Sequence, residues 1–433
     1  MTQPIIFCSV CKTPERDPSN PDSVGVDKLV QLNDLKVWSG GQTVQAEGHI
    51  CDQCVQLMAE ILEFNVQASS SDQLALEGLP SARAILERLD EHVMGQEVAK
   101  KIIATAAASH LRASLHNKSA GPDEKIGKSN ILIYGPTGTG KTFIVNMLAR
   151  ILGKDLSKHN APDYTAAGYV GKSVEGMIQD LFNACENDVE RTENGIIFID
   201  EVDKIAVSRG GAGGKDVNGR AVQQALLTML EGEVVEVEMP GGNPMAPPKK
   251  VPIDTSGILF VCAGSFAGIE KIVEKRLGTD NTPIGFGASS DEAVEKVNYH
   301  AEITKEDLFA FGIIPEMIGR LPSRGHLDAL DVETLRRIMT NPPNSHYKQR
   351  QRLFEISGSS LTFDDEALTA VAKFAQSQGT GARELNGVIN HIILEYEFDL
   401  DPEAEDSKDI VITEEIVKEK LKTYTSGKVD SEE

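Results

Sequence analysis

Residues 131–142 read Ile-Leu-Ile-Tyr-Gly-Pro-Thr-Gly-Thr-Gly-Lys-Thr, and this stretch decides the fold. Its last eight residues fit the phosphate-loop pattern G-x-x-x-x-G-K-[ST]. The four apolar residues before the loop predict a buried strand. After the loop, apolar residues recur at helical spacing and predict a helix: Phe143, Ile144, Met147, Leu148 and Ile151. A glycine-rich octapeptide alone can be an ordinary turn, but strand, loop and helix together predict a site for ATP or GTP.

The loop residues match the chemistry of phosphate binding. The glycines let the backbone curl so that successive N–H groups face the phosphates, and the following helix turns its positive end toward them. We expect Lys141 to reach the β- and γ-phosphates and the Thr142 hydroxyl to hold Mg²⁺. The predicted nucleotide-binding residues are Gly135, Pro136, Thr137, Gly138, Thr139, Gly140, Lys141 and Thr142.

A second apolar run, at residues 196–199, ends in Asp200 and Glu201. It predicts a buried parallel strand whose carboxyl end meets the nucleotide. Asp200 is then placed to join the Mg²⁺ shell, and Glu201 to orient and deprotonate the attacking water. Two acids after a strand often mean only that the strand runs into solvent, but a phosphate loop upstream favours hydrolysis.

Length and charge narrow the class of protein. The 433 residues suffice for two or three domains. A formal charge of −23 and a pI near 4.9 argue against non-specific binding to nucleic acid or anionic membranes. The first residues lack the features of a secretory signal, and no apolar run reaches about eighteen residues, so we expect a cytoplasmic protein.

Four of the six cysteines form two short pairs near the N-terminus, Cys8-x-x-Cys11 and Cys51-x-x-Cys54. Four thiolates suit tetrahedral Zn²⁺, so we predict a structural zinc site; four unligated cysteines are the alternative. Between the pairs, apolar residues from Val30 to Trp38 predict a hairpin that turns at residues 40–41. The apolar stripe after Cys54 is either the module's own core or a dimerisation face. Cys185 and Cys262 are predicted to be buried and unreactive.

Composition and periodicity divide the chain into five parts. We predict a zinc-binding module at 1–66, a Ser-rich linker at 67–80, and a three-layer α/β nucleotide-binding domain at 81–327. A small, mostly helical domain is expected at 328–425, followed by a disordered tail at 426–433. Glycine- and proline-rich segments at 207–219 and 239–252 are predicted to be long functional loops.

Five motifs in order resemble the ClpX family of AAA+ unfoldases, over residues 90–412. They are the octapeptide at 135–142, Gly168-Tyr169-Val170-Gly171, Ile-Ile-Phe-Ile-Asp-Glu-Val-Asp-Lys-Ile at 196–205, Pro-Glu-Met-Ile-Gly-Arg-Leu-Pro at 315–322 and Gly-Thr-Gly-Ala-Arg at 379–383. The resemblance implies an AAA+ P-loop ATPase that forms a homohexamer, uses ATP to pull protein substrates through a central pore, with or without adaptors, and delivers them to the ClpP peptidase.

The resemblance also implies roles for single residues. Arg320 would be an arginine finger reaching the neighbouring subunit, and Arg383 a second sensor that contacts the nucleotide of its own subunit. The remaining implied assignments are Val93 and Met94 at the adenine, Tyr169 and Val170 as the substrate grip in the pore, residues 215–217 as a second pore loop, and Ile284, Gly285 and Phe286 as the peptidase docking tripeptide.

The chain departs from the family pattern at several positions. Pro247-Pro248-Lys249-Lys250 stands where the family has a basic loop linked to tag recognition, and the zinc pairs are spaced farther apart than usual. His92 and Asn386 replace the tyrosine and arginine common at those positions. Ser265 is the one polar candidate for a first sensor at residues 262–265.

Three alternatives stay open at this point. The first is a free-standing remodelling chaperone that works without a peptidase. The second is an HslU-type unfoldase, which also has a Gly-Tyr-Val-Gly loop, although the zinc pairs and the Ile-Gly-Phe tripeptide point away from it. The third is a zinc-ribbon ATPase that binds nucleic acid, which the acidic charge disfavours.

Overall fold

The computed structural model describes residues 29–39, 42–51, 78–165, 172–207, 217–239, 249–278, 298–400 and 409–429. The chain divides into two compact units, Met1–Gly78 and Leu79–Glu433. None of the helices within the described ranges is long and apolar enough to cross a membrane.

The first unit contains the predicted hairpin. Strands β1 (Leu29–Ser39) and β2 (Gln42–Cys51) pair antiparallel from Ser39 opposite Gln42 to Leu29 opposite Cys51. The register shifts between Leu32 and Leu35, as a β-bulge does. The side chains of the four paired cysteines lie outside the described part of the chain, so the zinc site stays a prediction. Among the side chains that are described, no group of three or more His, Cys, Asp or Glu could hold a metal ion.

The second unit is built on a five-stranded parallel sheet with the strand order β11-β3-β10-β7-β4. The strands are β3 (Ile131–Tyr134), β4 (Leu156–Asn160), β7 (Ile196–Asp200), β10 (Leu259–Gly264) and β11 (Ser323–His326). Strand β10 lies between β3 and β7, with Val261 opposite both Ile131 and Phe198. The carboxyl ends of these three strands therefore meet at one edge of the sheet, where open α/β sheets bind their ligands.

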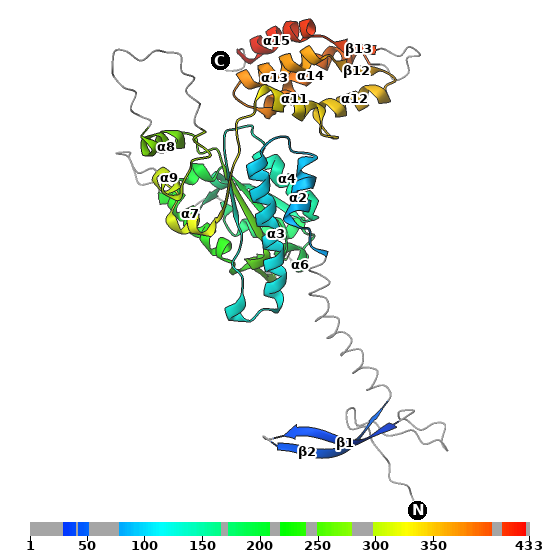
Figure 1. Ribbon diagram of the computed structural model, residues 1–433, viewed down its shortest axis with the longest axis vertical. Helices are drawn as coiled ribbons and strands as arrows, with labels where there is room; N and C mark the ends of the chain where they lie inside the picture. The colour runs from blue at the N-terminus through cyan, green and yellow to red at the C-terminus, as the bar shows by residue number, and fades with distance from the viewer. Residues whose placement is uncertain are drawn as a thin grey trace, which may run out of the picture. The chain divides into compact units, whose positions relative to one another are not determined.

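Helices cover both faces of this sheet, which confirms the predicted three-layer α/β domain. Helices α2 (Ala82–Asp90), α3 (Glu97–Ser119) and α4 (Lys141–Leu152) lie together along one face (Figure 1). The other face packs on α5 (Gly176–Ala184) and α7 (Val217–Glu231). Successive residues of β3 alternate between the two cores, because neighbouring side chains of a strand point to opposite faces.

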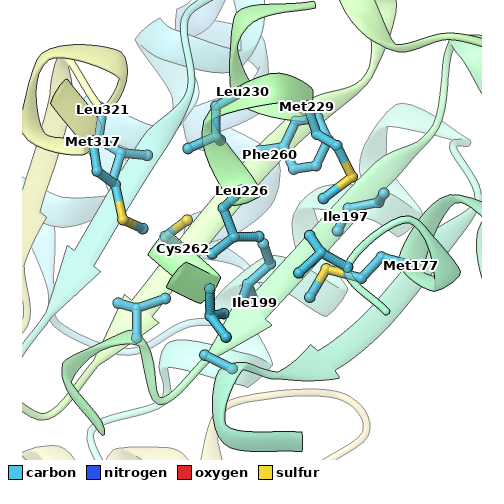
Figure 2. Packing of buried hydrophobic residues seen from close by; sticks show 14 of the residues in the cluster. Met177, Ile197, Ile199, Leu226, Met229, Leu230, Phe260, Cys262, Met317 and Leu321 are labelled. Carbon is cyan, nitrogen blue, oxygen red and sulfur yellow. The ribbon is translucent and has the colours of Figure 1, made fainter. Parts of the chain in front are cut away.

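The core on the α5 and α7 face is dense in methionine, leucine and isoleucine (Figure 2). Met177 packs beside Ile197 and Ile199 of β7, and Leu226 of α7 lies over the middle of the sheet. Cys262 is fully buried in this core, and burial raises the pKa of its thiol to about 12. Cys185 is also buried, with a pKa raised to about 11, so both cysteines are core residues as predicted.

Shorter elements complete this α/β region. They are η1 (Pro122–Glu124), η2 (Ala161–Asp163), β5 (Tyr164–Thr165), β6 (Lys172–Ser173), α6 (Val189–Glu193), η3 (Val202–Ile205), β8 (Val234–Glu238), β9 (Lys250–Asp254), η4 (Thr255–Gly257), α8 (Ile269–Leu277), α9 (Lys305–Phe311) and α10 (Pro315–Arg320).

The two predicted long loops are shorter than expected. Helix α7 begins at Val217, inside the segment 207–219, and β9 begins at Lys250, inside the segment 239–252. Strand β9 pairs antiparallel with β8, with Val251 opposite Val237, and Ile253 is buried. Pro252 is tolerated because this sheet has only two strands, so a proline there can turn away from the ladder.

The C-terminal part of the second unit has a core of its own. It comprises α11 (Val332–Thr340), α12 (His346–Ile356), α13 (Asp365–Ser377), α14 (Ala382–Phe398) and α15 (Glu414–Val429), with a parallel pair of β12 (Ser360–Phe363) and β13 (Asp409–Ile412). This is the small, mostly helical domain that the periodicity predicts. Its last helix corrects one expectation: α15 continues to Val429, four residues into the predicted tail, because Val417 and Leu421 anchor it on the core.

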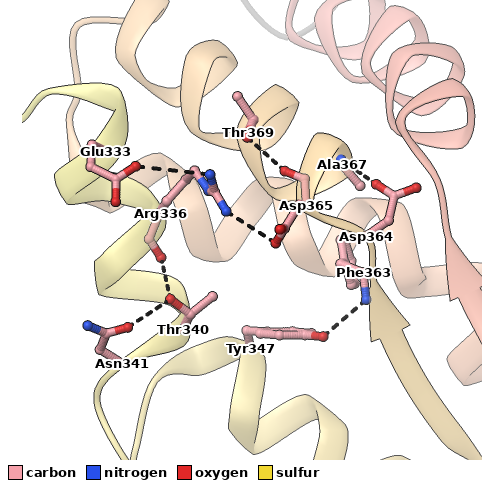
Figure 3. A network of polar contacts seen from close by, with 10 residues as sticks. All are labelled: Glu333, Arg336, Thr340, Asn341, Tyr347, Phe363, Asp364, Asp365, Ala367 and Thr369. Carbon is pink, nitrogen blue, oxygen red and sulfur yellow. Dashed lines mark hydrogen bonds and ion pairs between the residues drawn. The ribbon is translucent and has the colours of Figure 1, made fainter.

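Polar contacts join the helices of this small domain (Figure 3). Arg336 on α11 lies between Glu333 on its own helix and Asp365 at the start of α13, with an Nη2–Oδ1 distance of 3.2 Å to Asp365. The Tyr347 hydroxyl accepts a hydrogen bond of 3.0 Å from the backbone N–H of Phe363, which ties α12 to β12. These contacts link α11 to α13 and α12 to β12 within the small domain.

Candidate nucleotide-binding site

The phosphate loop joins β3 to α4 in a backbone shape that requires glycine. Gly138 and Gly140 have φ angles of 77° and 99°, in the left-handed region that other residues rarely adopt. Helix α4 begins directly after the loop at Lys141, and its first N–H groups form an anion-binding end. No atom lies within 4 Å of the place where a Cβ of Gly140 would project, so this side of the loop is open.

Lys141 is a buried cation at the centre of the site, with 9% of its surface exposed. Its ammonium donates to the carbonyl oxygens of Gly135 at 2.7 Å and Pro136 at 2.9 Å. Burial lowers its pKa; Asp200 opposes this shift, while nearby Arg383 adds to it. Within the described ranges no carboxylate forms an ion pair with Lys141. A buried ammonium held only by carbonyl groups suits the phosphate anion that the motif predicts.

Asp200 and Glu201 lie at the carboxyl end of β7, beside the start of α4. The Thr142 hydroxyl donates to Asp200 Oδ2 at 3.2 Å, so the two predicted Mg²⁺ ligands are neighbours. Hydroxyl and carboxylate oxygens are the protein ligands that Mg²⁺ prefers. Glu201 is exposed and has a φ of 57°, and its N–H donates to Asp200 Oδ1 at 2.9 Å. Such a left-handed glutamate costs about 1–2 kcal/mol, a strain often found at active sites.

Asp203, which the sequence reasoning did not single out, holds the first-sensor candidate Ser265. The Ser265 hydroxyl donates to Asp203 Oδ2 at 3.0 Å and the Ser265 N–H donates to Oδ1 at 3.2 Å. Asp203 is buried, and a Cβ at Gly264 would come within 2.6 Å of its Oδ1. The end of β10 is thereby fastened to the helical turn that follows Glu201.

A cavity of about 510 Å³ opens beside the loop, within the size range of nucleotide pockets. Val93 and Met94 line it from the α/β side. Leu330 lines it from the connector, residues 327–331 between β11 and α11, and Ile338 lines it from α11. These apolar side chains form a wall suited to a flat base. Arg383 projects into the same cavity from the first turn of α14.

The structure thus brings most of the predicted nucleotide residues together. The cavity lining includes His92, Val93, Met94, Gly138, Thr139, Gly140, Lys141, Thr142, Arg383 and Asn386. Phe143, one of the apolar residues that predict α4, is 46% exposed and lines the cavity. The sequence shows that Phe143 directly follows the phosphate loop, but only the structure shows that it faces a cavity shared with the small domain.

The small domain touches the phosphate loop directly. The Ala382 N–H donates to the Gly138 carbonyl oxygen at 3.1 Å. A Cβ on Gly138 would lie 1.8 Å from the Thr380 carbonyl oxygen, so only glycine permits this approach. Helix α14 therefore begins against the loop, which places Arg383 in the cavity beside the phosphate loop.

Arg320 lies elsewhere, at the end of α10. Its guanidinium pairs with Glu231 of α7, with Nη2–Oε1 and Nε–Oε1 distances of 2.9 and 3.0 Å, and is half exposed. It does not line the cavity of its own chain. To serve a neighbouring subunit, as the resemblance implies, Arg320 would have to leave Glu231, and the role stays a prediction.

Several predicted residues lie outside the described part of the chain. They are the zinc ligands Cys8, Cys11 and Cys54, the side chain of Cys51, the pore residues Tyr169 and Val170, and the docking residues Ile284, Gly285 and Phe286. Their roles stay predictions.

Comparison with protein families agrees with this architecture. Residues 127–324 match the AAA domain (Cdc48 subfamily), and residues 330–398 match the C-terminal, D2-small domain, of ClpB protein. The first match spans the phosphate loop, Asp200, Glu201 and Arg320, and the second spans Arg383. ATPases of this type use ATP with Mg²⁺, assemble as hexamers and bind protein substrates. An AAA domain followed by a ClpB-type D2-small domain, with both lining one cavity at the phosphate loop, indicates that the chain is a Clp/Hsp100-type AAA+ ATPase.

Proposed function

We propose that this ATPase is a protein unfoldase and translocase that works as a homohexamer and delivers its substrates to the ClpP peptidase. The observation that carries the proposal is the cavity shared by two domains, because a nucleotide bound there would contact the α/β domain and Arg383 of the small domain at once. Hydrolysis would then change the relation between two rigid bodies, which is how a ring ATPase produces movement.

Each step of hydrolysis would be carried out by a residue of the described site. Lys141 would leave its two carbonyl partners to hold the β- and γ-phosphates, and Thr142 and Asp200 would hold Mg²⁺, which neutralises the developing phosphate charge. Glu201 would take the proton of the attacking water at a carboxylate oxygen, since it lies next to Asp200 and is exposed. Arg320 of one subunit would approach the phosphates of the next and stabilise the transition state.

Substrate handling rests on the sequence motifs. Tyr169 and Val170, set between two glycines, would grip polypeptides of any sequence by apolar packing. Ile284, Gly285 and Phe286 would insert into apolar clefts of ClpP, because an aliphatic and an aromatic residue in a polar stretch suit a docking segment.

The decisive experiment is ATP-dependent assembly of the purified protein with ClpP, measured by sedimentation for wild type and Phe286→Ala. We expect the wild type to bind and the variant to lose binding while keeping its ATPase rate. The matched control is Phe309→Ala, since Phe309 is an exposed aromatic residue of α9 outside the tripeptide and should not affect ClpP binding. A wild type that hydrolyses ATP in well-formed rings without binding ClpP would instead indicate a free-standing remodelling chaperone.

The grip and the zinc module have tests of their own. Tyr169→Ala should leave ATP hydrolysis intact while abolishing unfolding of a tagged fluorescent protein, and normal unfolding would remove the grip assignment. Cys11→Ser should lower the zinc content of the purified protein, and an unchanged zinc content would show that the Cys₄ site is wrong.

A further inference from the structure

Gln96 joins the base-facing wall of the cavity to the connector between the two domains. Its side-chain Nε2 donates to the backbone carbonyl of Asp328 at 2.9 Å, and the Asp328 backbone N–H donates to Oε1 at 2.8 Å. One carboxamide thus satisfies both backbone groups of a residue 232 positions away in the chain. Gln96 is buried, with 8% of its surface exposed, and its two bonds to the exposed Asp328 are partly buried.

The backbone of Gln96 indicates that this contact is maintained against strain. Gln96 has φ 62° and ψ 36°, in the left-handed region, and it precedes the first residue of α3. Its carbonyl accepts from the Lys100 N–H at 2.9 Å, but its side chain does not cap the helix. The carboxamide therefore serves the connector and not the helix. Left-handed non-glycine residues persist where surrounding contacts hold them.

The two segments that Gln96 joins both contact the site. On one side, Val93 and Met94 line the cavity just before Gln96, and the buried Lys100 ammonium fastens the Val93 carbonyl at 3.2 Å. On the other side, the connector runs from Leu327, whose N–H donates to the Tyr134 carbonyl at 2.8 Å, to Leu330, which lines the cavity.

We propose that Gln96 is a positioning residue for the nucleotide base: its paired hydrogen bonds to Asp328 lock the 93–96 segment and the start of the connector into one body. Small-domain motion then pivots after Asp328, so that Leu330 moves with the small domain while Val93 and Met94 stay fixed to the α/β domain. This inference rests on the proposed placement of the base between Val93, Met94 and Leu330.

The phosphate end of the site has its own attachment to the small domain. The Ala382 N–H bonds to the Gly138 carbonyl, and this contact involves neither Gln96 nor the connector. We call the two hydrogen bonds between Gln96 and Asp328 the Gln96 clamp. Its loss should weaken binding of the base and leave binding of the phosphates unchanged. A change that merely destabilised the fold would weaken both.

The test compares ADP with inorganic triphosphate, each with Mg²⁺, in competition against a fluorescent ADP analogue. Gln96→Asn keeps the amide and suits a left-handed backbone better than glutamine, but it is one methylene too short to reach Asp328. We expect its Kd for ADP to rise about ten-fold, a typical size for the coupling between an intramolecular contact and a binding site, while its Kd for triphosphate stays at the wild-type value.

Two further variants sharpen the comparison. Gln96→Glu keeps an acceptor for the Asp328 N–H but sets a buried carboxylate oxygen against the Asp328 carbonyl oxygen, so it should weaken ADP binding at least as much as Gln96→Asn. Gln376→Asn is the matched control, because Gln376 Nε2 donates to the Leu330 carbonyl at 3.3 Å from the small-domain side, and shortening it should leave both affinities unchanged.

Two results would overturn the inference. Wild-type affinity for ADP in Gln96→Asn would show that the clamp positions nothing, and an equal loss for ADP and triphosphate would show that Gln96 only supports the fold. A wild type that binds ADP no better than triphosphate would overturn the base site itself and the clamp with it.

Discussion

Replacing Gly138 by alanine should separate the small domain from the phosphate loop. An added Cβ would lie 1.8 Å from the Thr380 carbonyl oxygen and 2.6 Å from the carbonyl carbon. Both are backbone atoms, so no change of rotamer relieves the overlap. Because ordinary contact starts near 3.4 Å, the two backbones must move apart by about 1.6 Å.

This separation should affect catalysis more than folding. It breaks the 3.1 Å hydrogen bond from Ala382 to Gly138 and carries the adjacent Arg383 away from the phosphates. A displacement of about 1 Å in a positioning group can cost roughly 100-fold in rate, so we expect kcat for ATP hydrolysis to fall by about that factor. The left-handed backbone adds about 1–2 kcal/mol of strain for alanine, enough to lower Tm by several degrees.

The assay is phosphate release at saturating ATP, with thermal melting of each variant. Gly153→Ala is the matched control, because Gly153 also has a positive φ of 61°, at the other end of α4, but has no atom within 4 Å of an added Cβ. It should lower Tm through backbone strain alone and leave kcat unchanged.

A double-mutant cycle tests the route of the effect. If Gly138→Ala acts by displacing Arg383, it should cost much less in an Arg383→Ala background than in the wild type. The same 100-fold loss in both backgrounds would refute this reasoning, because it would mean that alanine distorts the phosphate loop itself.

Three other perturbations follow from the geometry. Glu201→Gln should retain nucleotide binding while hydrolysis stops, and substantial phosphate release by that variant would remove the general-base assignment. Tyr164→Phe should lower the free energy of unfolding by about 1–3 kcal/mol in denaturant melts, because it removes the hydroxyl that lies 2.5 Å from Nδ1 of buried His159 and leaves that nitrogen only Asp180, at 3.9 Å; an unchanged midpoint would contradict this. Burial lowers the pKa of His110 from 6.5 to about 4, so between these pH values the unfolded chain binds a proton that the native chain does not. The free energy of unfolding is therefore highest above pH 6.5 and should fall by about 3 kcal/mol as the pH drops to 4. His110→Gln, which can still donate to the Gly257 carbonyl, should flatten that slope in melts across this range, and an unaltered slope would assign the acid loss to other groups.

The chemistry of the site was predictable because its pieces are local in the chain. The run 131–134 is β3, the run 196–199 lies in β7, and the helix expected after the loop is α4. A phosphate loop is a local backbone shape with a lysine and a threonine at set positions, so an octapeptide suffices to recognise it. The alternation of apolar strands and helices likewise predicted the three-layer domain.

Features that depend on a partner element elsewhere in the chain were harder to predict. Phe143 has the spacing of a core residue on α4, yet it lines the cavity, because the small domain provides a surface opposite it. The segment 239–252 looks like a loop by its prolines and glycines, but β8 offers β9 a partner strand. Local propensity gives way in such cases to a partner that the local sequence does not reveal.

The sequence by itself determined that this protein is an ATPase and predicted which two acids serve hydrolysis, since these predictions rest on short contiguous motifs. Only the tertiary structure decided that Thr380 rests against Gly138, that Asp203 holds Ser265, and that Gln96 clasps Asp328. The partners in these contacts lie 62 to 242 residues apart in the chain, and they meet because of the strand order and the path of the connector. A contact of that kind depends on the course of the whole backbone, which no single stretch of residues encodes.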